Sequence, residues 1–303
     1  MFDYGNARVA AARSRLLGRD DLTRLRDAGS PAAMLMLLER FEDWRSLLGD
    51  VASLAEPPAQ AIEAAIERFR ARRLGALLRW YSPPAVGLVE ALVVPLDVER
   101  LLAILRRRRA GQPSDRIGAA TAPGALLDAE AIGCLGRASS IGDALDRACA
   151  AGLLTRDDAR AVTRLAEDGE SPEHVERAIV AATDRARLAR VDGRSEAARI
   201  VRGAVEAELA VRTAAVGEAQ EAGAGIAAPG ERDATLRRLD GLAAHARRNP
   251  LGVGAVVGYV AAVEAQAIRL RAILAGSAGG WSPDLVGEYL HVGPGRRPAG
   301  QAV

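Results

Sequence analysis

The stretch NPLGVGAVVGYVAAVEAQAIRLRAIL, residues 249–274, decides the fold class of this chain. Its apolar residues recur at helical spacing, at positions 253, 256, 257, 260, 263, 267, 270 and 274, so they would line one side of a helix. Asn249 can cap a helix that starts at Pro250, because proline at the first helical position loses no hydrogen bond. We therefore predict a buried helix from Pro250 to about Leu274, whose early glycines let a second backbone approach closely.

Helix starts are marked along the rest of the chain by the same chemistry. Serine can cap the free N–H groups and proline can begin the helix at four pairs, Ser30-Pro31, Ser82-Pro83, Ser171-Pro172 and Ser282-Pro283. Thr155 and Asp158 resemble a capping box. No run of alternating β-branched residues predicts a strand. Residues 86–96 are read as a buried helix that Pro95 ends, because this proline would remove a hydrogen-bond donor from a sheet. The prediction is an all-α fold.

Glycine-rich breaks near residues 111–124, 223–230 and 276–280 divide the chain. An internal repeat supports the division, because the pattern Leu16, Leu17, Leu22, Leu25 returns 110 residues later as Leu126, Leu127, Ile132, Leu135. A second pattern at residues 97–106 returns at 269–275, with a faint middle copy at 208–213. We predict three helical units, residues 1–117, 118–225 and 226–292, followed by a disordered tail at 293–303.

Composition excludes several classes of protein. The 41 basic residues are all arginine and are interleaved with 39 acidic residues, for a net charge of +2, so no nucleic-acid partner is indicated. The N-terminus lacks the pattern of a signal peptide. The longest uncharged stretch, residues 249–263, is shorter than the roughly 20 residues that span a bilayer. We expect a soluble protein that does not itself cross a membrane.

Motifs for catalysis or cofactor binding are missing or lack context. Gly252, Gly254 and Gly258 give a GxGxxxG spacing, but the charged sequence before it does not read as the strand that a dinucleotide site requires. The three histidines are far apart, so no metal site is predicted. Without lysine the chain has no Walker motif and cannot hydrolyse ATP. We predict no catalytic residue, cofactor or metal.

Three segments resemble one known family. The segment from Asn249 and Pro250 through Gly252 and Gly254 to Tyr259, Glu264 and Arg269 looks like the C-terminal signature of the C subunits of archaeal-type and bacterial V-type ATP synthases, which are relatives of the d subunit of the vacuolar ATPase. The opening residues, which include Tyr4 and Arg8, are similar to the first helix of that family. Asp97, Leu101 and Arg106 resemble its repeated helix, although Arg100 stands where the family often has asparagine.

The resemblance implies a non-catalytic, all-α protein of three similar units in a pseudo-threefold, funnel-like arrangement. Such a protein sits on the cytoplasmic face of the membrane, between the proteolipid ring and the central stalk subunits D and F. Arg107, Arg108 and Trp281, in the turns around residues 107–115 and 276–284, are candidate partner contacts. Proton and sodium transport are not distinguished. Two alternatives remain open: a helical scaffold or regulator that binds acidic partners, and a helical enzyme that binds a nucleotide near Gly252.

Overall fold

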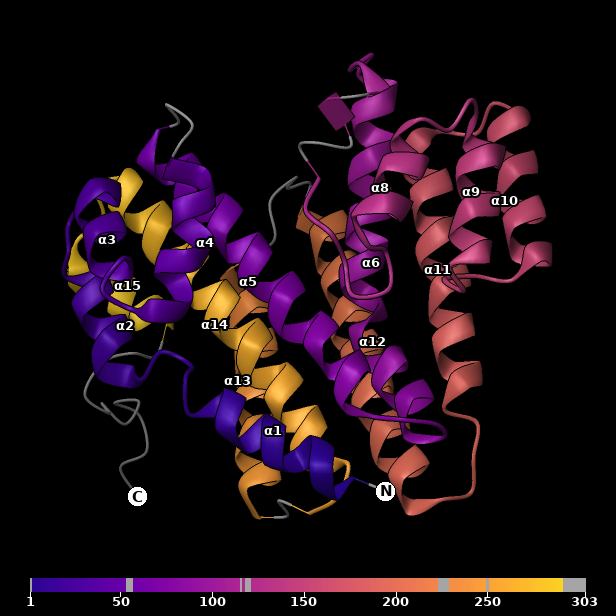
Figure 1. Ribbon diagram of the computed structural model, residues 1–303. Helices are drawn as coiled ribbons and strands as arrows, with labels where there is room; N and C mark the ends of the chain where they lie inside the picture. The colour runs from indigo at the N-terminus through magenta and orange to yellow at the C-terminus, as the bar shows by residue number, and fades with distance from the viewer. Residues whose placement is uncertain are drawn as a thin grey trace.

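The computed structural model describes residues 2–52, 57–114, 116–117, 121–222, 229–248 and 251–290, and in these ranges every regular element is a helix (Figure 1). The all-α prediction is confirmed. The helices are α1 (Asp3–Arg13), α2 (Arg19–Arg26), α3 (Pro31–Leu38), α4 (Glu42–Ala52), α5 (Pro58–Trp80), α6 (Ala85–Arg109), α8 (Ala129–Gly136), α9 (Ile141–Ala150), α10 (Arg156–Glu167), α11 (Pro172–Arg190), α12 (Glu196–Ala222), α13 (Pro229–Arg248), α14 (Gly254–Ala278) and α15 (Pro283–Leu290).

A first apolar core surrounds α14, which packs against α13, α5 and α1 and also contacts α2, α3, α12 and α15. Val256, Tyr259, Val263 and Leu270 of this helix expose no surface. The predicted buried helix is confirmed, but it begins at Gly254 rather than Pro250, after a turn at residues 251–253. Asn249 and Pro250 lie outside the described residues, as does the tail at 293–303.

The predicted close approach of a second backbone to α14 occurs at Gly258. A Cβ atom placed there would lie 2.0 Å from the Cβ of Ala246 and 3.2 Å from the carbonyl oxygen of Leu242, both on α13. Only glycine leaves room for this contact. The two long helices can therefore lie backbone to backbone, side by side in Figure 1.

A second apolar core lies among α8, α9, α10 and α11 and the later half of α6. It includes Leu101, Ile104, Leu135 and Ile179, which are all buried. The earlier half of α6 belongs to the first core, so this one helix connects the two cores. The three predicted units and their pseudo-threefold, funnel-like arrangement stay predictions.

Pro95 does not end a helix, so this part of the sequence-based prediction is wrong. It lies inside α6, which continues to Arg109. Proline has no N–H to donate to the carbonyl four residues earlier, here that of Ala91. The Nε of Arg187, from α11, donates to that oxygen at 2.9 Å. An arginine from another helix thus replaces the hydrogen bond that the proline removes.

The predicted helix caps are confirmed at three of the four serine-proline pairs. Ser30, Ser171 and Ser282 each accept a hydrogen bond from the backbone N–H three residues later. Thr155 likewise accepts from the N–H of Asp158. At Ser82 the prediction is wrong in detail, because α6 begins at Ala85. Pro84 disfavours a helical conformation at the residue before it and delays the start.

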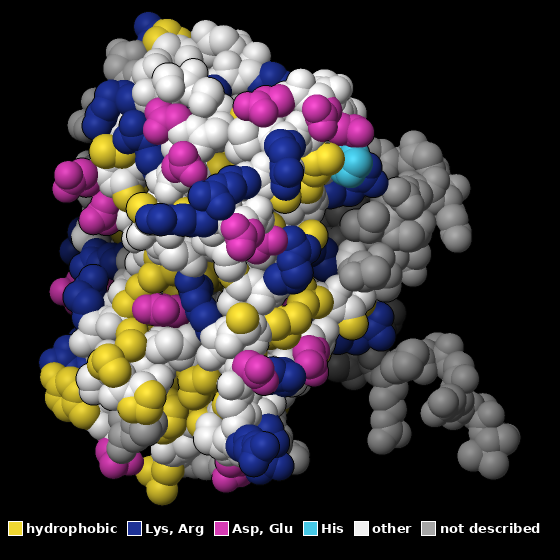
Figure 2. All heavy atoms as spheres, turned by 90° about the vertical axis from the view of Figure 1, so that its right-hand side faces the viewer, with side chains coloured by type: hydrophobic (Ala, Val, Ile, Leu, Met, Phe, Trp, Pro, Cys, Tyr) yellow, Lys and Arg dark blue, Asp and Glu magenta, His cyan; other side chains and the backbone are white. Residues whose placement is uncertain are grey.

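Arginine and acidic side chains are interspersed over the face shown in Figure 2, which carries α10 and α11. Neither sign of charge forms a continuous patch on that face. Within the described ranges, none of the helices combines the length and apolar character of a bilayer-spanning segment.

Candidate functional site

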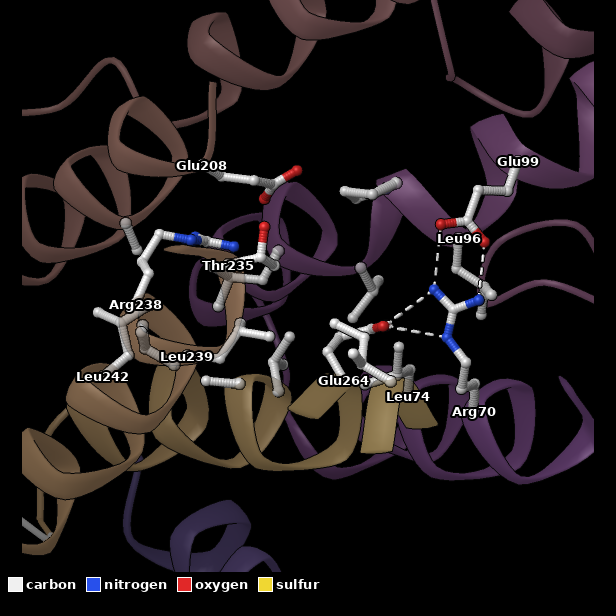
Figure 3. A pocket seen from close by; sticks show the side chains of 18 of the residues that line it. Arg70, Leu74, Leu96, Glu99, Glu208, Thr235, Arg238, Leu239, Leu242 and Glu264 are labelled. Carbon is white, nitrogen blue, oxygen red and sulfur yellow. Dashed lines mark hydrogen bonds and ion pairs between the residues drawn. The ribbon is translucent and has the colours of Figure 1, made fainter. Parts of the chain in front are cut away.

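A candidate site is a cavity of about 310 Å³ bounded by α5, α6, α12, α13 and α14 (Figure 3). Leucine and valine side chains form much of its wall, among them Leu96, Leu239, Leu242 and Val260. Charged side chains stand in two groups, which Figure 3 shows at opposite ends of the cavity. The cavity draws its walls from helices of both halves of the chain.

Arg70 is the centre of the first charged group. Its side chain, on α5, is only 5% exposed. Its Nη1 lies 2.7 Å from Glu99 of α6, and its Nη2 lies 2.9 Å from Glu264 of α14. One guanidinium therefore fastens three helices together, as the dashed lines in Figure 3 show. Its planar fork of donors suits this double pairing.

The charges of this group shift each other's pKa values. Burial alone would lower the pKa of Arg70, but the carboxylates of Glu264 and Glu99 raise it well above its usual value. Burial raises the pKa of Glu264, the nearby negative charge of Glu99 adds to the increase, and Arg70 offsets part of it. Arg70 is therefore permanently charged, whereas Glu264 takes up a proton more readily than an ordinary glutamate does.

Glu67 extends the first group beyond the cavity. Its carboxylate pairs with Arg70, Arg100 and Arg271. Arg271, on α14, also donates from Nε to Glu63 at 2.7 Å. The pairs join α14 to α5 along more than one helical turn, and α5 in turn to α6.

Arg187 is the centre of the second charged group, and its side chain is 1% exposed. Its Nη2 lies 2.9 Å from Glu208 of α12, and its Nη1 lies 3.2 Å from Asp184. Arg212 pairs with the same two carboxylates, at 2.6 Å from Glu208 and 2.9 Å from Asp184. Burial alone would raise the pKa of Glu208, but Arg187 and Arg212 lower it overall. Glu208 therefore stays ionised.

The structure brings the first helix, α1, together with the turn that precedes α14. Asn6 of α1 donates from Nδ2 to the carbonyl oxygen of Gly252 at 3.0 Å, and the hydroxyl of Tyr81 donates to Asn6 Oδ1 at 2.7 Å. Tyr4 and Arg8 lie on the same helix, where the guanidinium of Arg8 stacks over the ring of Tyr4. This cluster is separate from the cavity, whose lining contains none of its members.

Asp97 organises the loop before α8. It is fully buried and accepts hydrogen bonds from the backbone N–H groups of Leu126 and Leu127, at 3.0 and 2.8 Å from Oδ1. Gly124 leaves the space that the carboxylate fills, because a Cβ atom there would lie 1.9 Å from Oδ1. Burial raises the pKa of Asp97 to about 6, although the backbone donors lower it in part.

The remaining predicted residues are dispersed. Leu101 is buried in the second core, Arg106 pairs with Glu176, and Arg269 pairs with Asp240. Arg107 and Arg108, near the end of α6, are partly buried. Arg107 donates to the Thr121 hydroxyl, and Arg108 donates to the Gly136 carbonyl oxygen. Both arginines therefore contact other parts of this chain. The side chain of Trp281 is about half exposed.

Of the predicted signature residues, only Glu264 lines the cavity. Sequence reasoning missed Arg70, Arg187 and Arg238, because nothing in a chain rich in arginine marks which of them become buried. Arg70 and Arg187 also pair with carboxylates on other helices, Glu264 and Glu208, at sequence distances that no local spacing reveals. The Gly252 to Gly258 spacing follows a helix, α13, and not the strand of a dinucleotide-binding unit.

Comparison with known proteins supplies the family. A family model described as ATP synthase (C/AC39) subunit matches residues 5–213, which include Arg70, Asp97, Arg187 and Glu208. No curated protein matches the chain. The match ends before α13 and α14, so it does not test the C-terminal signature. It covers more than half of the chain, and its members are non-catalytic subunits of V-type and A-type rotary ATPases. The chain belongs to the ATP synthase (C/AC39) subunit family.

Proposed function

We propose that this chain is the adaptor of the central rotor, which joins the stalk subunits D and F to the proteolipid ring on the cytoplasmic face of the membrane. In this role it carries torque between the stalk and the ring during ATP-linked ion transport. It binds no nucleotide and catalyses no reaction.

The observation that carries this proposal is the cross-bracing of long helices by buried charge pairs. Arg70 holds α5, α6 and α14 together, and Arg187 holds α6, α11 and α12. Breaking a buried pair is costly, and close-packed cores deform little, so such a body transmits force rather than absorbing it. A rotor component needs this property, whereas an enzyme would need exposed reactive groups.

Two surface regions are the proposed contacts with partners. One is the turn after α6, near Arg107 and Arg108, and the other is the turn between α14 and α15 that carries Trp281. Trp281 and Leu285 are exposed apolar side chains close together in sequence at that second turn. Exposed aromatic residues at the ends of rigid helices are typical anchors of protein interfaces.

The test is affinity purification of the tagged chain from detergent-solubilised native membranes, with mass spectrometry of the proteins that accompany it. We expect the proteolipid and subunits D and F to be recovered. The variant Trp281→Ser should recover less of one partner, whereas Arg160→Gln, an exposed change on α10, should recover all of them. Recovery of the chain alone from intact complexes would reject the proposal.

A further inference from the structure

Arg238 lines the cavity, and no other described residue forms a hydrogen bond with it. It lies on α13, and its Nε is enclosed and, among the residues that the structure describes, has no acceptor within hydrogen-bonding distance. The other arginines of the lining, Arg70, Arg212 and Arg271, are each paired with carboxylates. An enclosed donor of this kind is costly to leave unsatisfied. A group that supplies an acceptor here would therefore bind favourably.

Glu208, the carboxylate drawn beside Arg238 in Figure 3, already accepts hydrogen bonds from two other arginines. Its Oε1 accepts from Arg187 and Arg212, and its Oε2 accepts from Arg187. The group at this end has three guanidiniums, of Arg187, Arg212 and Arg238, against the two carboxylates of Asp184 and Glu208, which leaves one surplus positive charge. Burial lowers the pKa of Arg238, and Glu208 offsets part of that decrease. An arginine at neutral pH nevertheless keeps its proton.

Thr235 adds a hydroxyl beside this guanidinium. It precedes Arg238 by three residues on α13, so both side chains lie on one helix face, and both line the cavity, as Figure 3 shows. Among the described residues, the Thr235 hydroxyl has no hydrogen-bond partner. A guanidinium and a hydroxyl on one face of a helix are a donor set for a carboxylate.

The rest of the wall selects the kind of molecule. Leu239 and Leu242 stand next to the donors in Figure 3, and Val260 lines the same cavity, so the wall offers an apolar surface to a ligand. The single surplus charge suits a monoanion, whereas the second negative charge of a phosphate dianion would have no balancing guanidinium in this group. The volume, about 310 Å³, lies at the lower end of the range for small-ligand pockets.

We propose that the cavity binds a monocarboxylate on an apolar stem, with the carboxylate on Arg238 and Thr235 and the stem against Leu239, Leu242 and Val260. The inference goes beyond the adaptor role and does not depend on it. The carboxylate can come from a free organic acid or from an acidic side chain of a partner protein, because both present the same chemistry.

Hexanoate is the probe, titrated into the purified full-length chain and followed by ligand-observed NMR. We expect binding in the millimolar range. Arg238→Gln should weaken it about tenfold and Thr235→Val by a smaller factor, because the charged donor contributes more than the hydroxyl. Arg199→Gln, which removes an exposed arginine of α12, should change nothing. Hexanol and hexylammonium, which lack the anion, should not compete.

The inference is overturned if hexanoate does not bind in the millimolar range, or if folded Arg238→Gln binds it as tightly as the unaltered chain does. Circular dichroism of each variant establishes that it is folded. The source of the carboxylate follows from competition. If hexanoate displaces a bound stalk protein, the site takes an acidic side chain of that protein. If both bind together, the site takes a free acid.

Discussion

Arg187→Met tests whether a side chain from α11 completes the backbone of α6. Methionine keeps an apolar stem but removes the donor to the Ala91 carbonyl and the partner of Asp184 and Glu208. Breaking a buried ion pair costs about 3–5 kcal/mol, and an unsatisfied buried carbonyl costs about 1–3 kcal/mol. Because Arg212 still pairs with both carboxylates, the low end of each range applies. We expect a loss of about 4 kcal/mol in the free energy of unfolding.

Urea unfolding followed by circular dichroism measures this loss. The control is Arg202→Met, which breaks only the exposed pair with Asp192 and should cost less than about 1 kcal/mol. Adding Pro95→Ala restores an N–H that can donate to Ala91. It should therefore stabilise the Arg187→Met variant by about 1–3 kcal/mol more than it stabilises the unaltered chain. If the free-energy changes of the two single variants sum to that of the double variant within about 0.5 kcal/mol, the reasoning is refuted.

Three further predictions concern single positions. The folded-state pKa of Asp97, about 6, is above its ordinary 3.8, so the folded chain binds this proton first as pH falls. Relative to Asp97→Asn, the free energy of unfolding should therefore rise by about 2 kcal/mol from pH 7 to pH 4, and a constant difference would contradict this. Gly258→Ala should lower the free energy of unfolding by about 1–3 kcal/mol, because the added methyl pushes α13 away from α14. Gly241→Ala, with open space around it, should not lower the free energy of unfolding in the same urea experiment. Ser171→Ala should cost about 1 kcal/mol by removing the cap of α11, and an unchanged urea midpoint would exclude that role.

Local rules were enough to predict the helices. The apolar spacing of residues 253–274 corresponds to the buried face of α14, and serine or threonine caps mark α3, α10, α11 and α15 where the sequence places them. Both features depend on residues within one or two helical turns. For the same reason, the glycine at position 258 could be interpreted as a point of close contact before its neighbour on α13 was known.

Pro95 shows where local rules stop. A proline in an apolar run predicts a helix end, and it would be one if Ala91 had no other donor. The donor is Arg187, 92 residues further along the chain, and nothing near Pro95 reveals it. The cavity poses the same difficulty, because Arg70 and Glu264 are 194 residues apart. Contacts of this range follow from the packing of whole helices, which no short pattern encodes.

The division of α6 between two cores has a consequence for the order of events during synthesis. The second core uses residues 94–182, so it is complete once α11 has left the ribosome. The first core joins α1 to α14 and must wait for nearly the whole chain. Domains fold as their last segment emerges, and contacts distant in sequence form slowly. The second core therefore forms first and presents the later half of α6 as a preformed template on which the two ends of the polypeptide assemble.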